Sequence, residues 1–283
     1  MSDDGRNEPF RLSADPSGAT LLRLSAWEAE FPWLSAGFST RIGGVSEAPW
    51  DSLNCGLHVG DRDEDVAENR KRVAKGAGFP FERWTCAEQV HGCEVAVAKA
   101  ADAGAGRLSR AEAIPSKDAL VTDAPGLMLN AFYADCVPIW FVDPTRRAVG
   151  LAHAGWRGAV ADVAGATVRE MERTFGTNPA DLLAAIGPSI RGCCYEVDDA
   201  VAKHIPKGSE ALAATSSPGR YKLDLAKFNR QKLTEAGIMA NRIEISQYCT
   251  SCRTDLFFSH RKENGRTGRM TAWIARKEEV ERP

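Results

Sequence analysis

The chain has 283 residues, of which 43% are hydrophobic and 26% charged, as is typical of a globular protein. Its 36 Lys and Arg residues nearly balance its 38 Asp and Glu residues, giving a formal net charge of −2. Nonspecific binding to nucleic acid or to an anionic membrane needs surplus positive charge, so we expect neither partner. No apolar run approaches the roughly 18 residues that a membrane-spanning helix needs.

The first 20 residues are polar and aperiodic, which predicts a disordered or frayed tail over 1–20 and one domain over 21–283. No apolar segment of a secretory signal follows the start, so we expect a cytoplasmic protein. Disulfides are rare in that reducing compartment, and several of the eight cysteines are therefore expected to be small core residues. The adjacent pair Cys193 and Cys194 is interpreted as buried filler.

The hydrophobic pattern predicts few helices and many short strands. In chain order these are a helix over 63–76, strands over 93–98, 119–122, 127–133, 138–143 and 148–153, a long helix over 158–175, a strand over 183–186, a helix over 225–236, and strands over 243–246 and 270–274. Segments 100–113 and 207–220 are interpreted as surface loops. This alternation indicates a mixed α/β arrangement of layers.

Two histidines and one cysteine, His91, Cys136 and His153, fall at predicted strand ends beside tight turns. Two imidazoles and a thiolate suit Zn²⁺ and leave a fourth position for water or substrate, while their wide spacing excludes a zinc finger. Asp135 either orients a ligating histidine or is a solvated turn acid. From the pattern alone, structural histidines remain an alternative to a metal site.

Three arginine-bearing turns suggest a small anionic substrate, although a solvated basic loop explains any one of them alone. Arg41 lies in a glycine turn over 39–46, Arg157 precedes the long helix, and His260 and Arg261 begin a basic segment over 259–269. Cys249-x-x-Cys252 has no second such pair and no thioredoxin-like βαβ context, so we assign it no function.

Several short motifs then occur in a fixed order over nearly the whole chain. They are Thr40-Arg41-x-Gly43-Gly44-Val45-Ser46, the segment from Asn54 to Asp61, Gln89-Val90-His91-Gly92, Ala134-Asp135-Cys136-x-Pro138, His153-Ala154-Gly155-Trp156-Arg157-Gly158, Gly187-Pro188-Ser189-Ile190, Cys249-Thr250 and Phe257-Phe258-Ser259. Together they resemble the laccase-domain family, described first as multicopper polyphenol oxidases and later as purine nucleoside phosphorylases. The family usually has Tyr where His260 stands.

The resemblance implies a single catalytic domain, an α/β (α+β) fold with a four-layer α/β/β/α sandwich of mixed sheets. It implies a zinc ion held by His91, Cys136 and His153. It also implies phosphorolysis of adenosine, inosine, guanosine and methylthioadenosine, with adenosine deamination as a second reaction. The partners would be a purine nucleoside and inorganic phosphate, and the chain would be a monomer or a dimer.

Within this interpretation, Arg41 and Arg261, followed by Arg157, are the candidate phosphate ligands. Asn54 and His260 are further candidate substrate residues, and His260 either stacks on the base or titrates near neutral pH. A deaminase reaction needs a proton carrier, for which Asp135 or a ligand thiol is a candidate.

Four alternatives remain open. A multicopper oxidase needs more imidazoles than five histidines provide, although one copper ion in place of zinc suits the three ligands. A metal-free cysteine hydrolase would use Cys136 as its nucleophile with His153 or His91 as base. Some relatives are described as editing hydrolases of UDP-linked peptidoglycan precursors. A nucleoside-binding module without turnover is the last alternative.

Overall fold

The computed structural model describes residues 8–278 and contains two large mixed sheets. The first has the strand order β1 (Arg11–Ala14), β2 (Thr20–Arg23), β3 (Leu34–Ser39), β15 (Met270–Arg276), β7 (Met128–Tyr133) and β4 (Trp84–Cys86). The second has the order β14 (Ile243–Ile245), β10 (Leu183–Ile186), β8 (Val137–Asp143), β9 (Ala148–Ala154), β6 (Ala119–Thr122) and β5 (Val95–Val97). Each sheet combines antiparallel and parallel pairs; β4 with β7, β10 with β14 and β5 with β6 are parallel.

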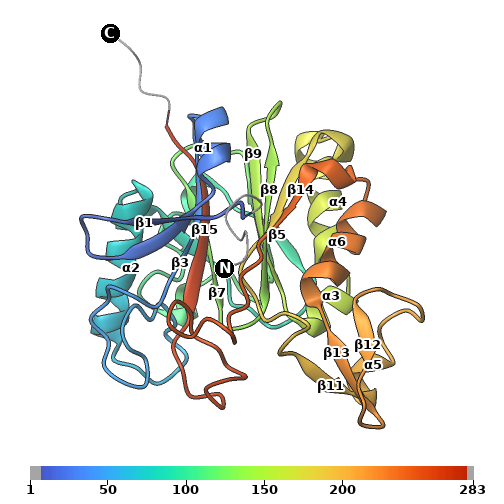
Figure 1. Ribbon diagram of the computed structural model, residues 1–283. Coiled ribbons are helices and arrows are strands. Elements are labelled where there is room, and N and C mark those ends of the chain that lie inside the picture. Colours follow the sequence, from blue (N-terminus) through green and yellow to red (C-terminus); the bar gives the residue numbers. More distant parts are fainter. Residues whose placement is uncertain (1–7, 279–283) are drawn as a thin grey trace.

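The two sheets pack face to face, and helices cover their outer faces (Figure 1). Helix α2 (Asp63–Ala77) lies on the first sheet, while α4 (Val163–Phe175) and α6 (Leu225–Glu235) lie on the second. The hydrophobic core between the sheets includes Phe38, Trp140 and Leu151, all buried. Further cores separate each sheet from its helices. The predicted α/β/β/α sandwich is therefore confirmed.

The central strands are buried on both faces because they lie between two layers. Every residue of β7, β8, β9 and β6 is buried, which is why these segments are nearly continuous apolar runs rather than alternating ones. Strong apolar runs are also the easiest strands to predict. All eight predicted strands and the helices over 63–76 and 225–236 occur within two residues of the expected bounds.

The long helix predicted over 158–175 is broken. A short helix, α3 (Trp156–Val160), precedes α4, and Asp162 between them has a left-handed φ of 66°. The Asp162 side chain accepts a hydrogen bond from the Gly165 amide at 3.2 Å, which caps the start of α4. The apolar spacing continues through the break, so hydrophobic periodicity alone does not detect it.

The expected frayed tail is wrong for the residues that the structure describes. Strand β1 pairs with β2, and Phe10 is buried against Trp140, with ring centroids 5.1 Å apart. The buried Glu8 carboxylate accepts hydrogen bonds from the Gln247 amide at 2.7 Å and the Ser246 hydroxyl at 3.1 Å. Residues 1–7 of the expected tail lie outside the described residues.

A third, small sheet was not predicted. Its order is β11 (Glu196–Asp198), β13 (Arg220–Leu223) and β12 (Leu212–Ala214), so the supposed loop over 207–220 contains a strand. Two short helices, α1 (Ser25–Glu30) and α5 (Asp199–Ala202), were also not predicted. The small sheet projects beside α3 at the lower right of Figure 1.

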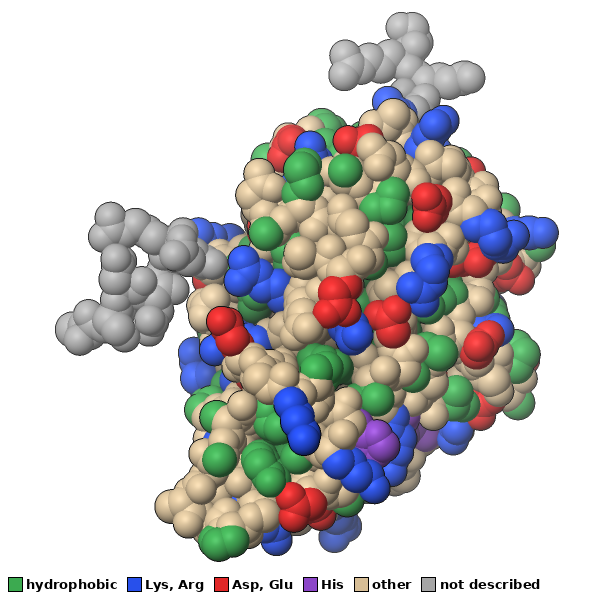
Figure 2. All heavy atoms as spheres, turned by 90° about the vertical axis from the view of Figure 1, so that its right-hand side faces the viewer, with side chains coloured by type: hydrophobic (Ala, Val, Ile, Leu, Met, Phe, Trp, Pro, Cys, Tyr) green, Lys and Arg blue, Asp and Glu red, His purple; other side chains and the backbone are tan. Residues whose placement is uncertain are grey.

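The surface on this side carries charges of both signs. Figure 2 shows Lys and Arg side chains interspersed with Asp and Glu, with hydrophobic side chains between them. Within residues 8–278, no helix combines the length and apolarity required to cross a membrane. The interpretation of Cys193 and Cys194 as buried filler is also wrong, since Cys193 is exposed and Cys194 half-buried.

Candidate metal centre and its cavity

The structure brings His91, Cys136 and His153 together from three separate segments. His91 lies between β4 and β5, Cys136 in the turn from β7 to β8, and His153 near the end of β9. One ligand atom from each lies within 4.8 Å of the other two, and the imidazole rings are nearly perpendicular with centroids 4.9 Å apart. These atoms are close enough to share one metal ion.

The side chain of Gln89 fixes the segment that carries His91. Its amide nitrogen donates to the Phe132 carbonyl at 2.9 Å, and its oxygen accepts from the Phe132 amide at 2.8 Å. The Gln89 side chain thereby makes the two backbone hydrogen bonds to Phe132 that a residue of a neighbouring strand would make. The QVHG motif is thus held against β7, the strand that leads into Cys136.

Asp118 binds two of the three ligand residues at once. Its Oδ1 lies 2.8 Å from His153 Nδ1 and accepts the His91 amide at 3.0 Å, and its Oδ2 accepts the Gly92 amide at 2.6 Å. Burial alone raises the pKa of Asp118, but the hydrogen bond and charge of His153 outweigh it and lower that pKa. An ionised carboxylate therefore holds His153 Nδ1 and leaves Nε2 as the nitrogen available to a metal.

The backbone at the site is locally strained. His91 has a φ of 61° and Asp135 a φ of 84°, both in the left-handed region that favours glycine. Gly155 provides space on the other side, because a Cβ there would lie 3.1 Å from Cys136 Sγ and 3.0 Å from the His91 ring. A larger residue at position 155 would therefore press on both the His91 ring and the Cys136 sulfur.

Cys136 and His153 shift each other's pKa. Burial alone raises the pKa of Cys136, but the charge of His153 and hydrogen bonds from both imidazoles outweigh it and lower that pKa to about 6. Burial alone lowers the pKa of His153, but the Cys136 thiolate and the Asp118 hydrogen bond raise it to about 9. In the absence of metal, the pair is a thiolate and an imidazolium near neutral pH, and the sulfur is already in its metal-binding form.

A cavity of about 480 Å³ opens onto the three ligands. This volume lies in the range of small-molecule sites. Three arginines, Arg70, Arg110 and Arg269, and the ring of Phe132 form part of its wall. The acidic side chain in the wall, Glu88, is paired with Arg110 at 3.0 Å. Unlike the mixed surface in Figure 2, the cavity is therefore strongly cationic.

Two further histidines line the cavity. His260, one of the predicted substrate residues, has its pKa lowered by desolvation and by nearby charges, Arg269 first among them. His58 also has a lowered pKa, from desolvation and from the charges of Arg269 and Arg110. The pKa of His58, about 4, makes its imidazole neutral at pH 7, and the lowered pKa of His260 favours the neutral form of that ring.

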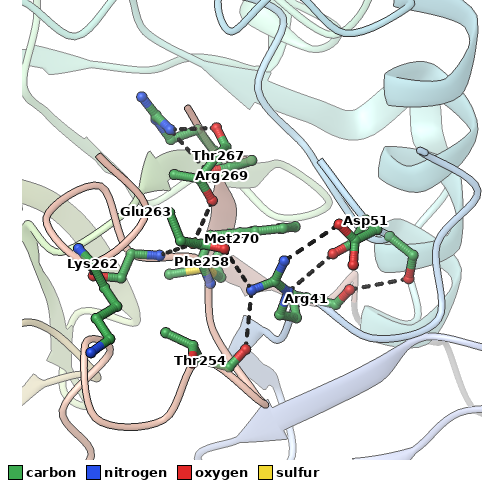
Figure 3. Close-up of polar contacts among 12 residues, drawn as sticks. Arg41, Asp51, Thr254, Phe258, Lys262, Glu263, Thr267, Arg269 and Met270 are labelled. Atoms are coloured by element: carbon green, nitrogen blue, oxygen red, sulfur yellow. Dashed lines mark hydrogen bonds and ion pairs between the residues drawn. The ribbon is translucent and has the colours of Figure 1, made fainter. Parts of the chain in front are cut away.

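Arg41, a predicted phosphate ligand, lines a separate open depression rather than this cavity. Its Nη1 donates to the Thr254 carbonyl and to Glu263 Oε1, each at 3.0 Å, and its Nε donates to the Asp51 carbonyl at 3.0 Å. Figure 3 shows the guanidinium directed toward these partners, close to Phe258. Its hydrogen bonds tie the 39–46 turn to the basic segment near the carboxyl end.

Asn54 is buried and is connected to the cavity wall by a hydrogen bond with Arg269. Its oxygen accepts the Arg269 amide at 2.8 Å, and its nitrogen donates to Asp61 at 2.8 Å. Arg157 and Arg261 lie outside the cavity wall, on aromatic rings: Arg157 over Trp156 and Arg261 over Tyr195. Burial and the charge of Cys136 raise the pKa of Tyr195 to about 12, although the charge of Arg261 opposes this shift. Tyr195 therefore lies near enough to Cys136 to feel its charge.

Asp135 does not orient a histidine; Asp118 has that position. The Asp135 carboxylate accepts hydrogen bonds from the Thr250 hydroxyl at 2.6 Å, the Ser259 hydroxyl at 2.8 Å and the Arg261 amide at 2.7 Å. It thus joins three parts of the chain at the residue before Cys136.

The sequence analysis missed Asp118, Arg70 and Arg269. Arg70 had a signal, because it lies on the same helical face as Val66 and Val73 and is buried with them. A lone arginine within an apolar stripe indicates a buried cation with specific partners. Asp118 directly precedes a fully buried strand, a position that does not distinguish it from an ordinary solvated acid.

The fold and the His–Cys–His cluster describe a mixed α/β protein with a candidate metal site. The family model described as multi-copper polyphenol oxidoreductase laccase matches residues 35–277. The chain therefore belongs to this laccase-like family.

The chain is also similar to known relatives and to solved structures. Purine nucleoside phosphorylase YlmD of Geobacillus stearothermophilus is 47% identical over 248 residues, 86% of this chain and 90% of that protein. YlmD of Bacillus subtilis is 39% identical, over 86% of this chain and 88% of that protein. The crystal structure of the Geobacillus YlmD superposes with a TM-score of 0.90 at 45% identity, covering 96% of this chain and 100% of that one. A Bacillus licheniformis hypothetical protein, YfiH, gives a TM-score of 0.89 at 41% identity, covering 95% and 99%.

Proposed function

We propose that this enzyme is a zinc-dependent purine nucleoside phosphorylase, which converts adenosine, inosine, guanosine or methylthioadenosine and phosphate to the base and a ribose 1-phosphate. Adenosine deamination is its proposed second reaction. The observation that carries the proposal is one cavity that combines three metal-ligand side chains with three arginines and an aromatic ring. The names of the relatives from Geobacillus and Bacillus subtilis support the same activity.

The donor set of His91, Cys136 and His153 fits a zinc ion. Sulfur and imidazole nitrogen are ligands that zinc prefers, and the Cys136 thiolate needs no further deprotonation near neutral pH. The Asp118 hydrogen bond supplies the support that ligating histidines usually have. When bound, the ion supplies a Lewis acid with an open coordination position, and copper is the alternative occupant.

Phosphate is proposed to bind against the arginines of the cavity wall. Arg269 donates Nη1 to the Thr267 and Gly268 carbonyls, each at 2.9 Å, which fixes the guanidinium plane. Arg70 is held as firmly, by hydrogen bonds to three backbone carbonyls and by stacking over Phe132 at 4.4 Å. Pre-organised guanidinium groups lose little entropy when they bind an oxyanion. Arg261 and Arg157 are retained as further phosphate candidates near Tyr195.

The base is proposed to lie among the neutral, flat side chains of the same cavity. Phe132, His58 and His260 offer ring faces or uncharged imidazole nitrogens. In phosphorolysis a phosphate oxygen attacks C1′ of the ribose while the bond from C1′ to the purine nitrogen breaks, and the purine leaves with a proton. Cationic residues on the phosphate side and neutral rings on the base side suit that distribution of charge.

The test is turnover of adenosine by the purified protein, with and without phosphate, measuring adenine and inosine together. We expect adenine and ribose 1-phosphate only when phosphate is present, and a smaller amount of inosine in both buffers. Inosine alone would make the enzyme a deaminase. Neither product, at micromolar enzyme, would overturn the proposal, and turnover of UDP-linked muropeptides would then assign the editing role instead.

A further inference from the structure

Four cysteines outside the proposed active site lie together; two are exposed, one is half-buried and one is buried. Cys193, Cys194, Cys249 and Cys252, here called the cysteine cluster, have all their sulfur atoms within 4.8 Å of one another. Cys194 and Cys252 sulfurs are 3.3 Å apart, Cys193 and Cys252 3.7 Å, and Cys193 and Cys194 3.8 Å. The pair Cys249-x-x-Cys252, which the sequence analysis leaves without a function, therefore has a second cysteine pair beside it in space.

The topology explains why these segments meet. β10 and β14 are parallel neighbours, so the segments that follow them leave the same edge of the second sheet. The two segments remain paired beyond the strands: Ser189 forms a bridge with Cys249, and the Thr250 amide donates to the Ser189 carbonyl at 3.1 Å. The cluster thus stands on a continuation of the sheet.

Tight turns then direct the sulfurs toward one another. The amides of Cys194 and Tyr195 both donate to the Arg191 carbonyl at 2.9 Å, and the amides of Cys252 and Arg253 donate to the Cys249 carbonyl at 3.2 and 3.0 Å. The Arg191 guanidinium pairs with Asp224 and donates to the Ser246 carbonyl, which joins the two segments again. These hydrogen bonds fix the turns that carry the four sulfurs.

The separations of the sulfurs are close to those of a tetrahedral zinc site. With a zinc–sulfur bond of about 2.3 Å, sulfurs at the corners of a tetrahedron are about 3.8 Å apart. A disulfide needs a sulfur separation of roughly 2.0 Å, and all four thiols are free. The Arg191 amide also donates to Cys249 Sγ at 3.4 Å, a contact typical of the hydrogen bonds that support thiolate ligands.

We propose that Cys193, Cys194, Cys249 and Cys252 bind a second metal ion, a zinc in a structural site of four thiolates. Four protein ligands fill the tetrahedral coordination, so this ion has no open position for substrate, in contrast to the ion proposed for the cavity. The site ties the segment after β10 to the segment after β14. The first segment ends at Glu196, whose carbonyl accepts Arg261 Nη1 at 2.8 Å, and Thr250 in the second binds Asp135.

The experiment counts zinc by atomic emission, and by mass spectrometry under non-denaturing conditions, in protein purified with reductant and without chelator. The natural chain should contain about two zinc ions, and His91→Ala about one. A Cys193→Ser/Cys252→Ser double variant should also contain about one zinc ion, whereas Cys93→Ser, a cysteine outside the cluster, should keep about two. Cobalt(II) loaded into His91→Ala should give the intense visible absorption of a tetrahedral ion bound by thiolates.

Several outcomes would overturn the proposal. One is a zinc content near one in the natural chain that falls to nearly zero in His91→Ala. Another is iron in place of zinc, or a mass two hydrogens lower with a disulfide mapped to the cluster. The His91→Ala arm leaves all four cysteines intact, so the test holds even if the double variant does not fold.

Discussion

Asp118 Oδ1 lies 2.8 Å from His153 Nδ1, and the same carboxylate accepts the backbone amide of His91. One buried side chain therefore sets the orientation of one candidate ligand and the backbone position of another. This arrangement makes Asp118 a positioning residue for the metal centre. It also gives the clearest way to test the site without removing a ligand.

Replacing Asp118 with Asn should weaken zinc binding at the cavity about 10- to 100-fold, because a neutral amide supports the His153 imidazole less well. The measurement is competition for zinc against a chromophoric chelator. Asp123→Asn serves as the control, since Asp123 is exposed near the other end of the same strand. Equal zinc affinity in the Asp118 variant and the natural chain would remove the positioning role.

The pKa shift of Cys136 predicts an unusual pH profile in metal-free protein. Because His153 lowers the pKa of Cys136 to about 6, the thiolate already predominates at pH 7. Alkylation of Cys136 by iodoacetamide should rise less than about twofold between pH 7 and pH 8, whereas an ordinary thiol rises nearly tenfold. Peptide mass mapping isolates this cysteine from the others. In His153→Gln the midpoint should move to higher pH; an unshifted midpoint contradicts the ion pair.

Arg269 and Arg41 are both well held, but only Arg269 lines the cavity. Arg269→Met should raise the KM for phosphate about 10- to 100-fold, the effect of losing hydrogen bonds to a charged group. Arg41→Met breaks contacts with Thr254 and Glu263 and should lower Tm, with a much smaller effect on that KM. Steady-state kinetics with thermal unfolding separates the two, and the reverse order of KM effects would restore Arg41 as the phosphate ligand.

The ordered amino-terminal segment predicts a stability effect at Phe10. Its ring is 1% exposed and packs on Trp140 between the two sheets, so Phe10→Ala should lower the free energy of unfolding by about 3–5 kcal/mol. Leu12, 48% exposed in the same segment, provides the control, and Leu12→Ala should change it by less than about 0.5 kcal/mol. Urea denaturation measures both. A Phe10 variant as stable as the natural chain would show that the segment contributes little to the core.

The sequence predicts those parts of the fold and site whose signal is local. Strands β6 to β9 are apolar runs and can be expected from residue order alone, whereas His91, Cys136 and His153 are singled out as candidate ligands mainly because their motifs resemble those of the family. Strand β1 could not be predicted because all its residues are exposed, so it has no alternation of buried and exposed positions. The small sheet could not be predicted for a similar reason: β12 and β13 lie in a polar segment whose pairing depends on tertiary contacts.

Contacts between distant segments are the other limit. Asp118 acquires its role only when β6 lies beside β9. Arg41 likewise forms its contacts with Thr254 and Glu263 only in the folded chain, because these residues are far from it in sequence. The cysteine cluster is the extreme case. Its two pairs are far apart in sequence, and they meet only through the parallel pairing of β10 with β14 and the contacts that continue this pairing beyond the strands.

The hydrogen bonds of Asp135 limit how the loops that contact it can change in evolution. Loops at a protein surface usually accept extra residues. Here the Thr250 and Ser259 hydroxyls both bind Asp135, the residue before Cys136, so an insertion in either loop should displace a candidate metal ligand. Length variation among homologues should therefore be scarce in these two loops and gather instead in connections such as the one over 100–113.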